Sequence, residues 1–225
     1  MKSIVRVLCI TFAVMFVFSD TYAQKKGKAF NGTVLYEITY PEAEIDPAMA
    51  GQLPTQMTVI INETKQKTEI STGMMSNIVI IDMVTNKTVI LLDLMGQKFA
   101  IRSSKEEMQS KQETTPNVKV TEETKEIAGY KCKKVEVTSE DSDDPMIVWV
   151  TDEILGDYDN WAGSFPGVKG LAMEYIADNN GMKMKMSVQT VTPGKFKDKD
   201  FLIPSDFKEV TAEELQEIFG GMGGE

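Results

Sequence analysis

Carboxylates, thioethers and thiols are the side chains of this sequence whose types and spacing could support chemistry. The 225-residue chain contains 34 aspartate and glutamate residues, 15 methionines and two cysteines, and it has no histidine. Without histidine the chain cannot form Ser-His-Asp or Cys-His nucleophile pairs or histidine-rich zinc sites, and it lacks the usual group that titrates near neutral pH. The acids and the sulfur-bearing side chains are therefore the candidates whose spacing we consider first.

Acidic residues gather at two places. One is the segment 140–144, and the other offers Asp152, Glu153, Asp157 and Asp159. Calcium favours about six to eight oxygen ligands, but neither place has the spacing of an EF-hand loop. Two carboxyls could also hydrolyse a glycosidic bond if burial raised the pKa of one of them. These acids fall at predicted turns or on outward strand positions, so we expect solvated charges and predict no metal site, no catalytic residue and no cofactor.

Methionines form the most unusual pattern. Met182, Met184 and Met186 alternate with Lys183 and Lys185, which places three thioethers on one face of a strand and two lysines on the other. Methionine adapts to irregular apolar space, so the pattern suits core packing first and contact with an apolar ligand second. Thioethers also bind Cu(I), but alternate residues of a strand lie ~7 Å apart and no histidine or second thiolate completes such a site. Copper is therefore the weakest interpretation.

Cys132 is the one cysteine beyond the predicted signal peptide, so it has no partner for an internal disulfide. Within the segment 130–138, strict alternation would place Cys132 on one face of the strand and Val135 and Val137 on the other, although all three are apolar. A β-bulge near Lys133 and Lys134 would shift the in-out phase and explain this pattern. We expect Cys132 to be a buried, unreactive thiol.

Short strands joined by tight turns must position these side chains. The stretch 32–40, for example, alternates between apolar residues such as Tyr36 and polar residues such as Glu37. Asn180 and Gly181 tolerate the positive φ that a two-residue hairpin turn requires. The expected strands are 32–40, 56–62, 66–71, 77–84, 88–94, 97–103, 118–127, 130–138, 146–152, 169–178 and 182–191.

These strands predict a mainly β fold. About ten or eleven strands with one apolar face each favour a curved antiparallel sheet that forms a half-open barrel, because a sheet that large tends to curl. A few short helices, at 42–53, 104–112 and 211–219, would partly close it. A β-sandwich is the alternative.

The chain divides into three predicted parts. Residues 1–23 have basic residues before an apolar run at 10–18 and end in the small residue Ala23, which is typical of a secretory signal peptide. The apolar run is shorter than the ~20 residues of a membrane-spanning helix. A single β-rich domain at 24–219 and a flexible Gly-rich tail at 220–225 follow. We expect a periplasmic or otherwise exported protein, soluble after signal cleavage.

Three stretches of the sequence resemble a known family. They read TKEIAGYKCKKVEV at 124–137, VWVTDEI at 148–154 and FLIPSDFKEVT at 201–211. They resemble an exported Bacteroidota family, domain of unknown function 4412, within the periplasmic lipoprotein-carrier (LolA-like) superfamily. The resemblance implies an incomplete antiparallel barrel with helices in its open side and a cavity able to hold acyl chains. It transfers no functional residue.

The expected function is non-enzymatic binding of a hydrophobic or lipid-like ligand on the concave face. The alternative is a cell-envelope module with a self-filled core that binds another envelope protein through a strand edge or its acidic face. A formal net charge of −10 disfavours nucleic acid as a partner, and the sequence leaves the oligomeric state open. The candidate ligand residues are Tyr36, Met57, Leu171, Met173, Tyr175, Met182, Met184 and Met186.

Overall fold

The computed structural model describes residues 29–41, 45–46, 50–104, 116–138, 145–154, 165, 168, 170–179 and 181–222. The predicted signal peptide and the acidic segment 140–144 lie outside these residues, as do Asp157 and Asp159. Most of the helix expected at 104–112 also lies outside them, and Ser104, where it was to begin, belongs to a strand. Half of the residues expected to be helical at 42–53 are outside the described part too.

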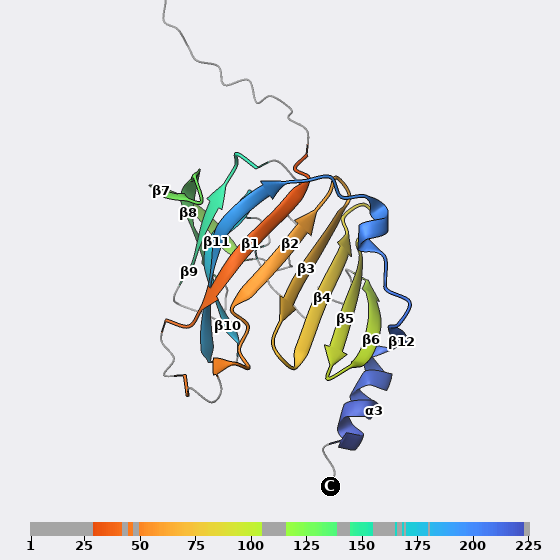
Figure 1. The fold of residues 1–225 in the computed structure, drawn as a ribbon. Helices are drawn as coiled ribbons and strands as arrows, with labels where there is room; N and C mark the ends of the chain where they lie inside the picture. Colours follow the sequence, from red (N-terminus) through yellow and green to blue (C-terminus); the bar gives the residue numbers. More distant parts are fainter. Residues whose placement is uncertain are drawn as a thin grey trace, which may run out of the picture.

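Twelve strands form one sheet (Figure 1). The sheet order is β12-β6-β5-β4-β3-β2-β1-β11-β10-β9-β8-β7, and every neighbouring pair is antiparallel except β12 with β6, which is parallel. The strands are β1 (Gly32–Thr39), β2 (Gln56–Ile61), β3 (Lys65–Ser71), β4 (Met75–Asp82), β5 (Lys87–Leu94), β6 (Gln97–Ser104), β7 (Asn117–Ile127), β8 (Tyr130–Thr138), β9 (Met146–Thr151), β10 (Leu171–Asn179), β11 (Met182–Pro193) and β12 (Lys208–Val210).

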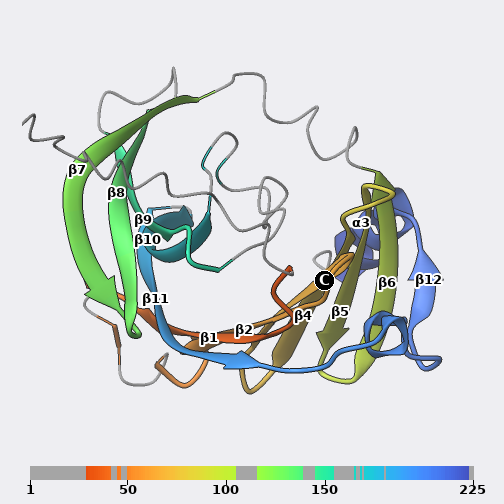
Figure 2. The ribbon, with the colours of Figure 1, turned by 90° about the horizontal axis from the view of Figure 1, so that it is seen from above.

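The prediction of a mainly β fold is confirmed. The β-sandwich alternative is wrong, because β1 pairs with β2 on one side and with β11 on the other and so joins both halves of the chain into a single open sheet. Figure 2 shows that this sheet curves strongly around a concave side. Two helical elements, the 3-10 helix η2 (Asp198–Phe201) and the α-helix α3 (Ala212–Met222), flank β12.

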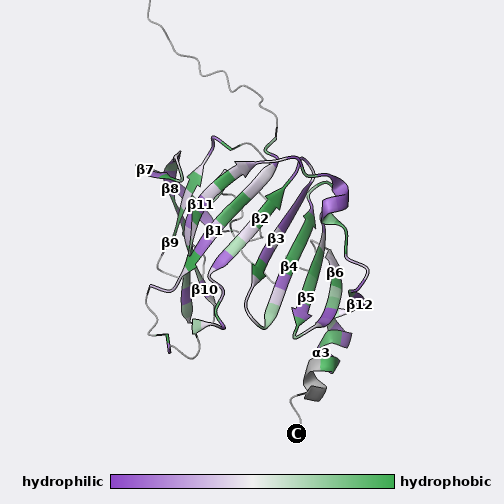
Figure 3. Ribbon diagram, in the orientation of Figure 1, coloured by the Kyte–Doolittle hydropathy of each residue, from purple (hydrophilic) through white to green (hydrophobic). Residues whose placement is uncertain are grey.

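Alternation along the strands gives the sheet two different faces, and Figure 3 shows hydrophobic and hydrophilic residues alternating along several strands. The face that carries Val34, Tyr36 and Ile38 holds the largest apolar cluster of the described residues, which also includes Ile154 of the connection after β9. That connection begins on the inside of the curve in Figure 2, so this face is the concave one. The segment that follows β11 runs along the outside of the curve in Figure 2. It covers the convex face of β4 to β6, where Phe201 packs against Ile80.

Local sequence signals place several elements as expected. Asn179 pairs with Met182 across the predicted tight turn, and Gly181 has a φ of 84°. The amide of Thr211 donates to the Glu214 carboxylate at 2.8 Å, and the Glu214 amide donates to the Thr211 hydroxyl at 3.1 Å. This reciprocal pair caps α3 and confirms the helix expected at 211–219.

The phase change around Cys132 has a structural cause. Between β7 and β8 the register shifts, so that residues 121–123 of β7 lie opposite the single residue Lys134. The irregularity is therefore at the predicted place, but the extra residues belong to the partner strand β7. Among the described residues, no helix combines the length and the apolar character that crossing a membrane requires.

Candidate functional site

Six of the eight predicted ligand residues lie in the concave apolar cluster as buried side chains. They are Tyr36, Met57, Leu171, Met173, Tyr175 and Met186. Met184 is half-buried and packs against the same cluster, whereas Met182 is half-buried and lies outside it. Strands β1, β2, β10 and β11 thus bring seven of the eight together.

The chain's own side chains cover these residues. Ile154, Phe165 and Val168, which follow β9, are buried in the same cluster. The ring of Phe165 meets the ring of Tyr175 edge-on, with 4.8 Å between the centroids. The hydroxyl of Tyr36 donates a hydrogen bond of 2.7 Å to a main-chain carbonyl of β10. The thioethers of Met184 and Met186 therefore face apolar neighbours from the same molecule, whereas Met182 lies outside this cluster.

The remaining sulfur and acidic candidates that the structure describes, Cys132, Asp152 and Glu153, have structural roles. Cys132 is fully buried, and this burial raises the pKa of its thiol to about 11. Asp152 is exposed and pairs with Lys133 at 3.3 Å, while the exposed Glu153 accepts the amide of Lys131. Within the described part of the chain, no three cysteine, aspartate or glutamate side chains are placed to hold a metal ion.

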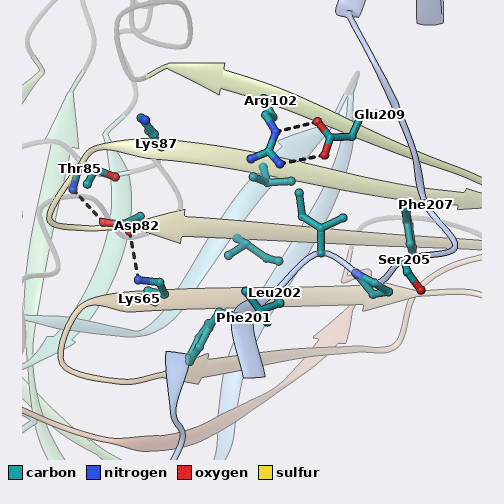
Figure 4. Close-up of a pocket in the computed structure, with 14 residues that line it drawn as sticks. Lys65, Asp82, Thr85, Lys87, Arg102, Phe201, Leu202, Ser205, Phe207 and Glu209 are labelled. Atoms are coloured by element: carbon teal, nitrogen blue, oxygen red, sulfur yellow. Dashed lines mark hydrogen bonds and ion pairs between the residues drawn. The ribbon is translucent and has the colours of Figure 1, made fainter. Parts of the chain in front are cut away.

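A pocket lies on the opposite face, where sequence reasoning found none. Residues 194–207, here called the C-terminal strap, cross the convex face and leave a cavity of ≈ 580 Å³ beside β3 to β6 (Figure 4). We call this cavity the strap pocket. Its apolar lining is Ile80, Val89, Phe201, Leu202, Ile203, Pro204 and Phe207. Its polar lining is Lys65, Asp82, Thr85, Lys87, Arg102, Ser205 and Glu209.

Polar contacts at both ends hold the strap in place. At its start, Asn31 accepts the amide of Phe196 at 2.9 Å and donates to the Phe196 carbonyl at 3.3 Å. Near its end, Lys98 pairs with Asp206 at 2.6 Å, and the Lys98 ammonium lies 5.6 Å from the ring centroid of Phe207. Between these points the buried Phe201 anchors the strap to the sheet.

Two ion pairs border the strap pocket. Lys65 donates to Asp82 at 3.1 Å, and the amide of Thr85 donates to the same carboxylate at 2.8 Å. Burial opposes ionisation of Asp82, but these hydrogen bonds outweigh it and hold the pKa of Asp82 below its ordinary value. Arg102 binds Glu209 through two hydrogen bonds of 2.9 Å, and these bonds lower the pKa of Glu209.

Comparison with known proteins gives a family and a distant fold relative. A family model described as Domain of unknown function (DUF4412) matches residues 43–164. Two solved structures of PNGF-II, in different space groups, are similar in fold, with TM-scores of 0.53 and 0.52 and 16% identity. They cover 84% and 85% of this chain, and the chain spans 33% of their own length. No curated protein matches the sequence.

Proposed function

This chain belongs to the Domain of unknown function (DUF4412) family, because the family match spans more than half of its 225 residues. We propose that it is a non-enzymatic binding protein for an amphiphilic, lipid-like ligand. The strap pocket is the observation that carries this proposal. Ligand sites are typically concave, mostly apolar and lined by a few polar groups, with volumes of about 300–1,000 Å³. The strap pocket, at ≈ 580 Å³ with an apolar floor, fits that description.

The acids of the pocket favour binding over catalysis. Asp82 and Glu209 both have lowered pKa values, because hydrogen bonds from Thr85 and Lys65 in the first case and from Arg102 in the second stabilise their charged forms. A carboxylate in this state is a poor general acid near neutral pH, since that role needs a raised pKa. Their role in this proposal is to orient neighbouring cations.

The same proposal places the protein outside the cytoplasm and describes its curved sheet as a half-open barrel of the lipoprotein-carrier type. The secretory pattern of residues 1–23 and the curvature in Figure 2 support these two points. Ligand contact by the concave methionine cluster also stays a prediction. The burial of Met173 and Tyr175 under Phe165 gives it less support than the open strap pocket has.

A second candidate function, binding of another envelope protein, is favoured by one surface feature. Met74, Met75 and Met95 are 52%, 42% and 84% exposed, and the Met95 amide bonds the Met74 carbonyl across neighbouring hairpin tips. Exposed apolar side chains that gather in this way are typical of contact surfaces. The sheet edges are less suitable, because β7 is bulged and charged and β12 has three residues.

Filling the strap pocket tests the proposed function. Ser205 is exposed and lines the pocket, so Ser205→Trp should fill it without disturbing the core. We expect this variant to bind a dansyl-labelled undecanoic acid at least about tenfold more weakly than the wild type does. Ser71→Trp is the matched control, because Ser71 is an exposed serine on β3 that does not line the pocket.

The result separates three interpretations. Weak binding by Ser205→Trp alone supports the strap pocket. Loss of binding in Met184→Glu with normal binding in Ser205→Trp would move the ligand to the concave face. If the wild-type protein binds no probe and carries no lipid in native mass spectra after purification from its own host, the protein-binding function is favoured.

A further inference from the structure

The charged residues of the strap pocket are concentrated at one end. On the convex face, Lys65 of β3 pairs in register with Asp82 of β4, and Asp82 pairs in register with Lys87 of β5. This charged row lies beside the turn that joins β4 to β5. Thr85 of the same turn completes that end of the pocket.

The next row towards the strap is apolar on two strands. Ile80 pairs in register with Val89, and Val89 pairs in register with Arg102 of β6. Beyond this row the strap residues Phe201 and Ile203 cover the sheet. The pocket therefore has a charged end and an apolar floor, which is the distribution that an amphiphile needs.

The charged end has an excess of cations. Three cationic side chains and two carboxylates line the pocket, although the whole chain carries a net charge of −10. Lys65 is engaged by Asp82 and by Asp198 of the strap. The side chain of Lys87 forms no ion pair or hydrogen bond with any other described residue, so its ammonium remains available to a ligand.

Arg102 is also able to bind an anion. Its Nε and one terminal nitrogen donate to Glu209, which leaves the second terminal nitrogen with its two N–H donors free of that pair. Both side chains are more than half exposed, so the pair adds little to stability. Its effect is to fix the direction of the guanidinium. Lys87 and Arg102 are diagonal neighbours on adjacent strands, within reach of one ligand group.

We infer that the strap pocket binds single-chain amphiphiles with an anionic head group, carboxylate or phosphate, which Lys87 and Arg102 hold while the aliphatic chain lies along Ile80, Val89 and the strap. This inference rests on the proposed function of the same pocket. Charge-assisted hydrogen bonds to such head groups are about twice as strong as neutral ones. An acidic protein repels anions over most of its surface, so it needs a local pair of cations to retain one.

Competition between ligands with one chain length tests the inference. Dodecanoate, dodecyl phosphate and dodecanol compete with the dansyl probe below their micelle concentrations. We expect both anions to displace the probe at about tenfold lower concentration than dodecanol does. The ratio between dodecanoate and dodecyl phosphate then identifies the preferred head group. Added salt should weaken the binding of the two anions and leave the binding of dodecanol unchanged.

Two variants test whether Lys87 and Arg102 bind the head group. Lys87→Gln and Arg102→Gln should each reduce the affinity for dodecanoate about five- to tenfold and change the affinity for dodecanol less than about twofold. Lys67→Gln is the control, because Lys67 lies on the same face, pairs with Glu69 and does not line the pocket. Circular dichroism spectra should be the same for all three variants.

Failure of this inference and failure of the proposed function give different results. If dodecanol competes as well as dodecanoate and Lys87→Gln changes nothing, the anionic head group is wrong while pocket binding stands. If the anions bind tightly but Ser205→Trp binds them normally, the site lies outside the strap pocket, so this inference is wrong while amphiphile binding by the protein stands. If none of the amphiphiles binds the wild-type protein, both are wrong.

Discussion

Replacing Met173 with alanine should lower the free energy of unfolding by about 3–4 kcal/mol, because the side chain is packed core. Met173 is 0% exposed and lies in the concave cluster. Alanine removes the three heavy atoms beyond Cβ, which at ~0.8 kcal/mol each gives about 2.4 kcal/mol of lost transfer free energy. The surrounding side chains close the resulting cavity only in part, which adds the remaining 1 kcal/mol or so.

Met182 provides the comparison within the same sheet. It is half-buried and lies outside the cluster, so Met182→Ala loses about half of the transfer term and leaves no enclosed cavity. We expect a cost of about 1 kcal/mol. Both methionines were predicted to contact a ligand, and the structure separates them by burial.

Urea unfolding followed by tryptophan fluorescence measures the difference. With a slope of about 2–3 kcal/mol per molar urea, the midpoint of Met173→Ala should lie about 1 M below that of Met182→Ala, at unchanged slope. Equal midpoints, with both variants near the wild type, would refute the packed-core interpretation. Met173 would then line an open cavity on the concave face.

Three further outcomes follow from a thiol, a hydroxyl and a carboxylate of the sheet. Cys132 should react with a disulfide reagent far more slowly in native than in denatured protein, because burial raises its thiol pKa to about 11, and equal rates would contradict this. Tyr36→Phe should cost about 1–2 kcal/mol in urea unfolding, because it removes the hydroxyl that bonds the Ala172 carbonyl; an unchanged midpoint would mean that water replaces it. Burial opposes ionisation of Glu174, but hydrogen bonds from Lys125 and Lys185 outweigh this effect and lower the pKa of Glu174 below its ordinary value of 4.5. Stability contributed by Glu174 is therefore present above the unfolded-state pKa and lost as the pH falls through the folded-state pKa, so Glu174→Gln should lose less stability below pH 4.5 than the wild type does in acid titrations of unfolding.

Local patterns were sufficient to predict most of the sheet. The alternation of β1 and the turn before β11 depend on neighbouring residues, and both are found as expected. The cap of α3 is also local, since Thr211 and Glu214 are three residues apart. The strand β12 was missed because three residues are too few to show a period, and it exists through its parallel pairing with β6, about a hundred residues earlier in the chain.

The placement of the methionines shows where sequence reasoning stops. Alternation correctly assigned Met184 and Met186 to the side of β11 opposite the exposed Lys183. It could not predict what lies over them, because Phe165 and Val168 come from a connection without periodicity. The side of a strand is a local property, whereas the choice between core and ligand surface depends on distant segments.

The strap pocket depends on such distant pairs throughout. Phe201 and Phe207 stand in a segment with neither strand nor helix periodicity, so no sequence signal showed that they cover β4 to β6. Lys87 falls in the turn expected between the strands 77–84 and 88–94, and Arg102 lies on the strand expected at 97–103; neither was a candidate site residue. Register and the strap together convert them from solvated charges into one end of an apolar pocket. The function of a lysine on a strand can therefore be inferred only after its neighbours across the sheet are known. Lys87 is the clearest example, because its place beside Arg102 in the pocket lining depends on the register of β5 and β6.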